Sequence, residues 1–310
     1  MNILITGATG FIGTNLLEAL KKTNHNIYCI SRKKNTNSDR LTWIKTNLEN
    51  TNFEFLKKIK IDFVFFLAGQ TSIINAKLYP EQNYRINSLS LIKLINYFKN
   101  INQTPFILYT STMSVYGLNN ENNKINPITL YDVSKVSSEF YLNEYIRQKI
   151  ISGCIFRLSN IIGCYSRKQK KDRGIISKMI KKIINQESID IWGDGKYFRD
   201  YLHIDDLIHL FLITLKKYKK MNGYIFDVGS GKSITIRDAF KKLLTISKKY
   251  FNTTSKINFI PFPDDSELIE KRSTFINIEL LKKITGWKKK YNFEDSIIKI
   301  IEKELKNERK

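Results

Sequence analysis

The chain has 310 residues, of which 42% are hydrophobic and 12% aromatic, and it carries a formal net charge of +23. This length accommodates one large domain or two moderate ones, and the apolar content excludes a disordered chain. No run approaches the roughly 20 apolar residues of a membrane span, and the first residues enter a strand pattern directly, so we expect neither a membrane partner nor a signal peptide.

The positive charge is dispersed along the chain, mostly as lysines in pairs such as Lys21-Lys22 and Lys181-Lys182. Such pairs are typical of solvated helix faces, whereas nucleic-acid sites concentrate their cations and interleave them with aromatic residues. We therefore expect no nucleic-acid partner, although the charge can attract an anionic substrate. Cys29, Cys154 and Cys164 lack metal-binding or CxxC spacing, which predicts core thiols, no metal site and a cytoplasmic location.

The first fifteen residues predict a strand, a glycine turn and a helix. An apolar run at residues 3–5 is typical of a buried parallel strand, and leucines at helical spacing follow the glycines. We expect Gly7 to permit a tight turn, Gly10 to let the backbone approach a pyrophosphate, and Gly13 to let helix and strand pack closely. Because a helix N-terminus attracts phosphate, the pattern predicts a dinucleotide site.

The rest of the first half alternates strand and helix. Apolar runs predict strands at residues 27–30, 41–46, 63–67, 106–110 and 153–158. Helical spacing predicts helices at residues 53–60, 86–99 and 132–149. The alternation indicates an α/β fold with a Rossmann-type, doubly wound parallel sheet.

The second half is less regular. It predicts helices at 175–185, 205–217 and 236–249, strands at 189–192 and 224–228, and a final helical region after Pro261 and Pro263. The charged segment 165–174 predicts a mobile loop. We expect residues 1–163 to form an NAD(P)-binding domain. Residues 164–310 should form mainly a smaller C-terminal substrate-binding lid, with some segments returning to the Rossmann core.

A hydroxyl cluster and a tyrosine–lysine pair carry the predicted chemistry. The strand at 106–110 runs into Ser111 and Thr112, and Tyr131 and Lys135 follow on one face of a helix. A phenol with a pKa of about 10 can act as a base near neutrality only if that pKa falls by roughly 2–3 units. A neighbouring ammonium and a cationic nicotinamide ring can cause this fall, and Thr112 can hold the substrate oxygen.

These motifs together resemble the NAD-dependent epimerase/dehydratase family of extended short-chain dehydrogenases/reductases, whose members mostly modify nucleotide sugars. Further motifs that carry the resemblance are Leu67-Ala68-Gly69, Asn87, Tyr116-Gly117, residues 157–163, residues 192–206 and Gly286-Trp287. The resemblance implies that Thr112, Tyr131 and Lys135 are the catalytic triad. It also implies a homodimer formed through a helix pair, a nucleotide-diphosphate sugar as substrate and a role in polysaccharide biosynthesis.

The resemblance also assigns binding residues. It implies cofactor contacts from Gly7, Gly10, Phe11, Ile12, Gly13, Ser31, Arg32, Leu67, Ala68, Gly69, Tyr131 and Lys135. It implies substrate contacts from Thr112, Asn160, Arg199 and Arg272, and a guanidinium suits a diphosphate because its N–H groups fork onto the oxygens. An ion pair with Asp200 or Asp205 is the alternative for Arg199. His203 and Asp205 are expected to be structural.

Two departures from the family pattern narrow the range of expected cofactors and reactions. NAD-using members place an acidic residue after the second strand, whereas this chain has Ser31-Arg32-Lys33, which would accept a 2′-phosphate. We therefore expect NADP(H), with NAD possible. The 4,6-dehydratases of the family follow the triad threonine with Asp-Glu, whereas this chain has Met113-Ser114, which argues against water elimination.

Reductase and epimerase remain, and both begin with hydride transfer at a sugar carbon, expected at C4. A 4-keto-sugar reductase is favoured because 4-epimerases of this kind usually retain NAD. A nucleotide-sugar 4-epimerase is the alternative. A non-catalytic RNA-binding or scaffold relative is a minor alternative, since it would be expected to have lost the triad.

Overall fold

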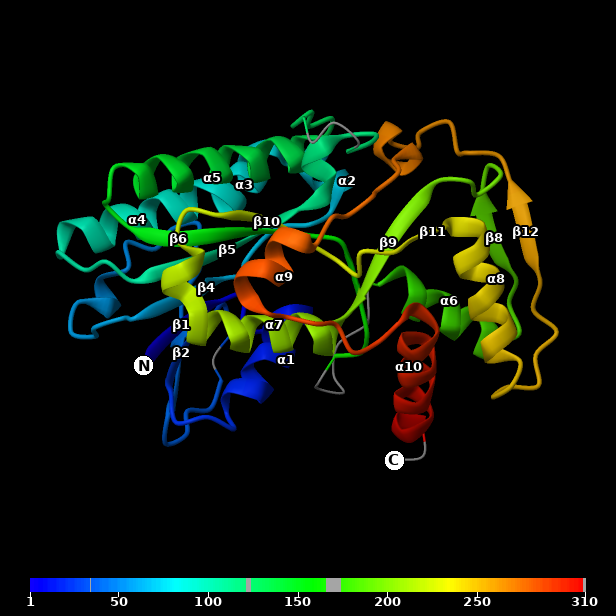
Figure 1. Ribbon diagram of the computed structural model, residues 1–310, viewed down its shortest axis with the longest axis horizontal. Helices are drawn as coiled ribbons and strands as arrows, with labels where there is room; N and C mark the ends of the chain where they lie inside the picture. Colours follow the sequence, from blue (N-terminus) through cyan, green and yellow to red (C-terminus); the bar gives the residue numbers. More distant parts are fainter. Residues whose placement is uncertain (34, 121–123, 166–173, 309–310) are drawn as a thin grey trace.

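The computed structural model describes residues 1–33, 35–120, 124–165 and 174–308, and its larger part is a seven-stranded sheet (Figure 1). The strand order is β10-β6-β5-β4-β1-β2-β3, and every neighbouring pair is parallel. The strands are β1 (Asn2–Thr6), β2 (Asn26–Ser31), β3 (Leu41–Lys45), β4 (Phe63–Phe66), β5 (Phe106–Thr112), β6 (Ser152–Leu158) and β10 (Ile225–Val228). This confirms the predicted α/β fold of Rossmann type.

Helices cover both faces of this sheet (Figure 1). One face carries α1 (Phe11–Leu20) and α7 (Ile204–Lys217), and the other carries α4 (Ser90–Asn100) and α5 (Leu130–Arg147). Strand β4 serves both layers, because Phe63 and Phe65 pack into the core with α1 and α7, whereas Val64 and Phe66 pack into the core with α4. All four side chains are fully buried, as expected for a parallel strand covered on both faces.

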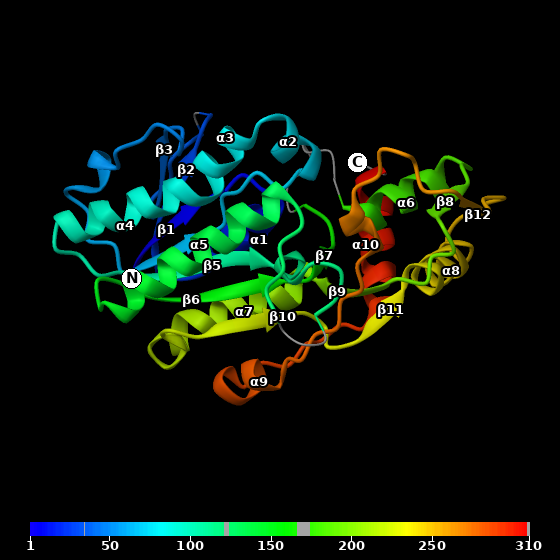
Figure 2. The same ribbon diagram turned by 90° about the horizontal axis from the view of Figure 1, so that it is seen from above.

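A smaller part lies beyond the carboxyl ends of the large sheet (Figure 2). It contains a sheet of β11 (Ser233–Thr235), β9 (Phe198–His203) and β7 (Asn160–Ile162), a pair of β12 (Ile257–Ile260) and β8 (Ile189–Trp192), and the helices α6 (Ile175–Ile184), α8 (Ile236–Ser247) and α10 (Phe293–Glu308). Its core joins Ile180, Ile189, Leu243 and Ile301. Strand β10 comes from the second half of the chain but pairs with β6 in the large sheet.

The short elements contain the main differences from the predicted pattern. They are α2 (Ile73–Leu78), α3 (Pro80–Tyr84), a π-helix at Arg85–Leu89, α9 (Glu279–Thr285), and 3₁₀ turns at Glu54–Leu56, Met113–Tyr116, Tyr218–Met221 and Leu268–Lys271. The helix predicted at 53–60 is wrong, because Phe53 adopts a φ of 64° and only a 3₁₀ turn follows it. That turn buries Phe53 and Leu56 completely in the core with α4.

Three further predictions concern the charged loop, membrane-spanning helices and the cysteines. The charged loop predicted at 165–174 falls outside the described residues except at its two ends. In the part of the chain that the structure covers, no helix has the length and apolar character needed to cross a bilayer. The three cysteines are buried, as predicted for core thiols.

Candidate active site

The glycine turn lies between β1 and α1, at the point where the strand order reverses. Gly7 has a φ of +69°, and a Cβ atom there would lie 2.8 Å from the backbone nitrogen of Ala68, so only glycine fits. A Cβ on Gly13 would overlap the Gly7 carbonyl oxygen. Helix α1 has no side-chain cap and no acidic residue in its first turn, which leaves its N–H groups available to an anion.

The other predicted cofactor residues surround this turn. Leu67, Ala68 and Gly69 directly follow β4, the neighbour of β1, whereas Phe11 and Ile12 form the half-buried first turn of α1. Ser31 ends β2, and its hydroxyl accepts hydrogen bonds from the Lys33 N–H and the Asn35 amide, each at 3.2 Å. Arg32 and Lys33 are exposed beside it. These positions fit a dinucleotide laid across the carboxyl ends of β1, β2 and β4.

The predicted triad meets at the carboxyl end of β5. Thr112 ends that strand, and Tyr131 and Lys135 come from the first turns of α5, where the two side chains lie one turn apart. The Tyr131 phenol interacts with the Thr112 hydroxyl. The Lys135 ammonium donates a 2.6 Å hydrogen bond to the Thr110 carbonyl and lies 4.2 Å from the centroid of the Tyr109 ring. Burial lowers the pKa of Lys135 to about 7.

A chain of hydroxyl groups links this site to a buried carboxylate. The hydroxyls of Thr112 and Ser114 are 2.9 Å apart, and the Ser114 hydroxyl donates to Asp132. Thr129, the N-cap of α5, donates to the other Asp132 oxygen at 2.7 Å. Asp132 has no exposed surface, and burial raises its pKa while the two hydroxyl donors lower it.

The electrostatics of Tyr131 differ from the sequence expectation. Burial raises its pKa, and the negative charge of Asp132 raises it further, whereas the charge of Arg272 lowers it, as does a hydrogen bond from Thr112 when Thr112 is the donor. The sequence predicts that a neighbouring ammonium and a cationic nicotinamide ring together lower the pKa of this phenol. The residues of this chain instead favour the protonated phenol.

Asn160 and Arg272, two of the predicted substrate residues, share a cavity of about 150 Å³ with Thr112 and Tyr131 of the triad. The described residues that line it are Thr71, Ile73, Thr112, Met113, Ser114, Tyr131, Leu158, Ser159, Asn160, Ile269, Arg272 and Thr274. Asn160 and Arg272 therefore lie beside Thr112 and Tyr131. The Asn160 amide also donates to the Asp200 carbonyl at 3.0 Å, which fixes its position.

Arg199 is placed differently, since it is not among the described residues that line this cavity. Its guanidinium donates to the carbonyls of Arg272 and Glu270, the latter at 2.8 Å. Burial, together with the charge of Arg272, lowers the pKa of Arg199 to about 10. The Asp200 carboxylate accepts instead from the Ser230 N–H at 2.7 Å and the Ser230 hydroxyl at 2.8 Å. Arg199 thus holds the segment that carries Arg272.

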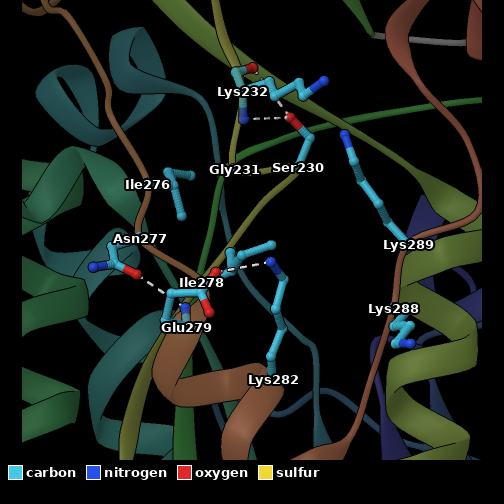
Figure 3. A pocket seen from close by; sticks show the side chains of 10 residues that line it. All are labelled: Ser230, Gly231, Lys232, Ile276, Asn277, Ile278, Glu279, Lys282, Lys288 and Lys289. Carbon is cyan, nitrogen blue, oxygen red and sulfur yellow. Dashed lines mark hydrogen bonds and ion pairs between the residues drawn. The ribbon is translucent and has the colours of Figure 1, made fainter.

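A larger hollow of about 610 Å³ lies elsewhere, between the loop after β10 and α9 (Figure 3). Its described lining is Ser230, Gly231, Lys232, Ile276, Asn277, Ile278, Glu279, Lys282, Lys288 and Lys289. Glu279 pairs with Lys282 at 2.8 Å (Figure 3). The hollow contains none of the predicted catalytic residues, so size does not identify the active site here.

Sequence reasoning missed the part played by Ser114 and Asp132. The signal was present, because a threonine followed three residues later by an acidic residue is a helix-capping pattern, and Thr129 and Asp132 have that spacing. It also missed how Asn87 joins two parts of the site. The Asn87 amide donates to the Ser134 hydroxyl at 2.9 Å, and its oxygen accepts from the Gln70 N–H at 2.8 Å.

Several known proteins are similar to this chain in sequence or in fold. The model of the NAD dependent epimerase/dehydratase family matches residues 3–229. A dTDP-D-glucose 4,6-dehydratase from Dictyostelium discoideum is 29% identical over 96% of this chain and 80% of that protein. The crystal structure of UDP-glucose 4-epimerase from Thermotoga maritima with UDP-glucose has a TM-score of 0.84 at 22% identity, covering 99% of both chains. RMD from Pseudomonas aeruginosa, complexed with NADPH, has a TM-score of 0.77 at 21% identity, covering 97% of this chain and 98% of that one.

Proposed function

Because the chain belongs to the NAD-dependent epimerase/dehydratase family, we propose that it is an NAD(P)-dependent oxidoreductase that reduces a 4-keto nucleotide sugar. The observation that carries this proposal is the position of Tyr131. Its phenol lines the same cavity as Thr112, Asn160 and Arg272, at the end of the sheet that carries the glycine turn. The surrounding residues favour its protonated form, which is the form that can give a proton to a carbonyl oxygen.

The residues of this chain have separate tasks in the proposed reduction. Arg272 binds the diphosphate and Asn160 orients it, because a cation and an amide donor match phosphate oxygens. Thr112 lies beside the carbonyl oxygen, and Tyr131 gives its proton to that oxygen as the carbon becomes tetrahedral. A nicotinamide cofactor at the glycine turn would supply the hydride. Lys135 would hydrogen-bond the ribose of that cofactor.

The end of β2 supports NADP(H) as the cofactor. Arg32 and Lys33 are exposed where an adenine ribose would lie, and Ser31 adds a hydroxyl. Two cations there attract a 2′-phosphate, whereas an acidic residue would repel it. The neighbour RMD was solved with NADPH.

The site argues against a dehydratase, although two relatives bear that name. The two positions after Thr112 hold Met113, which is 5% exposed and packs in the core, and Ser114. The carboxylate of Asp132 is fully buried and accepts from two hydroxyls, so it does not face the cavity as an acid or base for substrate. A 4-epimerase is the second candidate, since the same triad can serve it and a neighbour of high fold similarity is a UDP-glucose 4-epimerase.

We also propose a homodimer, in which α5 contributes to a helix pair. Phe140 and Tyr141 on the outer face of α5 are 62% and 44% exposed, and Val133 is 47% exposed. Large apolar side chains gathered on one helix are typical of a covered surface.

The discriminating experiment releases any cofactor from the purified protein and identifies it by mass. Retained NAD(H) would favour the epimerase. A protein that turns over NADPH with a 4-keto nucleotide sugar is the expected result for the reductase. Tyr131→Phe should abolish either activity and leave cofactor affinity largely intact, and full turnover by that variant would refute the assignment.

A further inference from the structure

The hydrogen atoms of the hydroxyl chain can be assigned one by one. Asp132 in its ionised form only accepts hydrogen bonds, so the single hydroxyl hydrogen of Ser114 goes to Asp132. In the 2.9 Å contact between Thr112 and Ser114, Thr112 must then be the donor. The Ser114 N–H donates to the Thr112 oxygen at 3.2 Å. Thr112 can therefore only accept a hydrogen bond from Tyr131, through a lone pair of its oxygen.

This direction determines what Tyr131 can do. Thr112 could stabilise a Tyr131 phenolate only by donating its hydrogen, and that hydrogen is committed to Ser114. A lone pair facing the phenol favours a phenol that keeps its proton. The carboxylate of Asp132, next in the chain to Tyr131, acts in the same direction through its charge.

We propose that Asp132, acting through Ser114 and Thr112, is a positioning residue that keeps the hydroxyl proton on Tyr131, so that this centre donates a proton to a carbonyl oxygen rather than accepting one from an alcohol. The inference rests on the proposed reductase function and deepens it. In the step itself the Tyr131 O–H bond breaks and an O–H bond forms on the former carbonyl oxygen, while the cofactor supplies the hydride. Tyr131 regains its proton from water before the next turnover.

Groups from β5, from α5 and from the segment around Arg272 enter this balance. Thr112 and Tyr109 face it from β5, and the Tyr109 phenol is buried and stays neutral because burial raises its pKa strongly. Arg272 approaches after the 3₁₀ turn Leu268–Lys271, and its charge opposes Asp132. Lys135, on α5, donates one hydrogen bond to the Thr110 carbonyl, and burial lowers the pKa of Lys135 to about 7. Burial and the charge of Asp132, which favour the protonated phenol, outweigh the groups that oppose them, so the pKa of Tyr131 is raised.

The test follows the Tyr131 phenol directly in the protein saturated with NADP⁺, or with NAD⁺ if that is the cofactor it binds. Protein labelled with ¹³Cζ-tyrosine is titrated from pH 6 to pH 11, and Tyr131→Phe identifies the resonance by its loss. Asp132→Asn removes the negative charge. It can also reverse the direction of the hydrogen bonds through Ser114 and Thr112, because an amide N–H can donate to Ser114. We expect the Tyr131 phenolate to form at a pH lower than in the unmodified protein by about 1 unit or more.

Ser114→Ala distinguishes the effect of the hydroxyl groups from the effect of the Asp132 charge. It also replaces Asp132→Asn as the test if that variant does not fold. It keeps the carboxylate but releases the Thr112 hydrogen toward Tyr131, so we expect a smaller downward shift. Asp227→Asn is the matched control, because this half-buried carboxylate accepts from the Tyr116 hydroxyl at 2.9 Å and its removal should leave the Tyr131 resonance unchanged. An unchanged or higher midpoint in Asp132→Asn or Ser114→Ala, or no phenolate up to pH 11 in either, would overturn the inference.

Turnover gives the second measurement. For reduction of a 4-keto nucleotide sugar, the alkaline limb of kcat/KM should move to lower pH in Asp132→Asn by the same amount as the resonance. If the resonance moves but no keto sugar is reduced, the proposed function fails and the control of Tyr131 by Asp132 stands. If reduction occurs and neither the resonance nor the limb moves, the proposed function stands and this inference fails.

Discussion

Lys135 offers a quantitative test of the site, because its ammonium is almost completely removed from water. It is 4% exposed, and burial lowers its pKa from 10.5 to about 7. Each unit of such a drop corresponds to about 1.4 kcal/mol of stability that the folded protein loses when the group is charged. The drop of about 3.5 units therefore predicts a cost of about 4–5 kcal/mol at pH 6, where Lys135 is protonated in both the folded and the unfolded chain.

The dependence on pH isolates this cost from other effects of a substitution. Between pH 7 and 10.5 the unfolded chain holds a proton on Lys135 that the folded chain has lost, so the free energy of unfolding rises with pH in this window. Lys135→Met has no such proton. Its loss of the hydrogen bond to the Thr110 carbonyl costs the same at every pH. The stability difference, variant minus unmodified protein, should fall as pH rises from 7 to 10.5.

Urea unfolding of the cofactor-free protein and of Lys135→Met at pH 6, 8 and 10 measures this difference. Lys181→Met, at an exposed position of α6, is the control and should give a difference that does not change with pH. A Lys135→Met difference that stays constant from pH 6 to pH 10 would refute the electrostatic account of this site.

Three further outcomes test other parts of the structure. Gly7→Ala should weaken cofactor binding in calorimetry by about tenfold or more, because its Cβ would crowd Ala68. Gly223→Ala is the control: Gly223 also has a positive φ, but the nearest neighbour of its Cβ would lie at 3.9 Å, so cofactor binding should be unchanged. Arg32→Glu should lower NADPH affinity by about tenfold and spare NADH, and equal losses for both would contradict the 2′-phosphate site. Glu139→Gln should cost about 3–5 kcal/mol in urea unfolding, since it removes the carboxylate that forms an ion pair with the buried Arg157, and a loss below about 1 kcal/mol would count against that expectation.

The sequence was most informative where a local pattern determines the structure. Strands such as β4 are continuous apolar runs, and burial on both faces requires that composition. The glycine turn is set by the backbone needs of Gly7 and Gly13, which no other residue meets. Tyr131 and Lys135 could be paired because four residues on a helix make one turn.

The features that could not be predicted from the sequence depend on contacts between distant segments. Ser114 meets Asp132 only because α5 packs against the end of β5, across 18 residues of chain. Arg199 binds backbone carbonyls 71 and 73 residues away, and a carbonyl leaves no mark in a sequence. Helices α2 and α3 are short and separated at Pro80, so neither is long enough to show a clear period.

The pairing of β10 with β6 also has a consequence for synthesis of the chain. One edge of β6 is bonded to β5, and the other receives a partner only when residues 225–228 have been made. A nascent chain that stops near residue 163 would present this apolar edge to solvent, where it can join other chains. The large sheet is therefore completed late in translation, and a fragment that ends near residue 163 is a poor choice for expression.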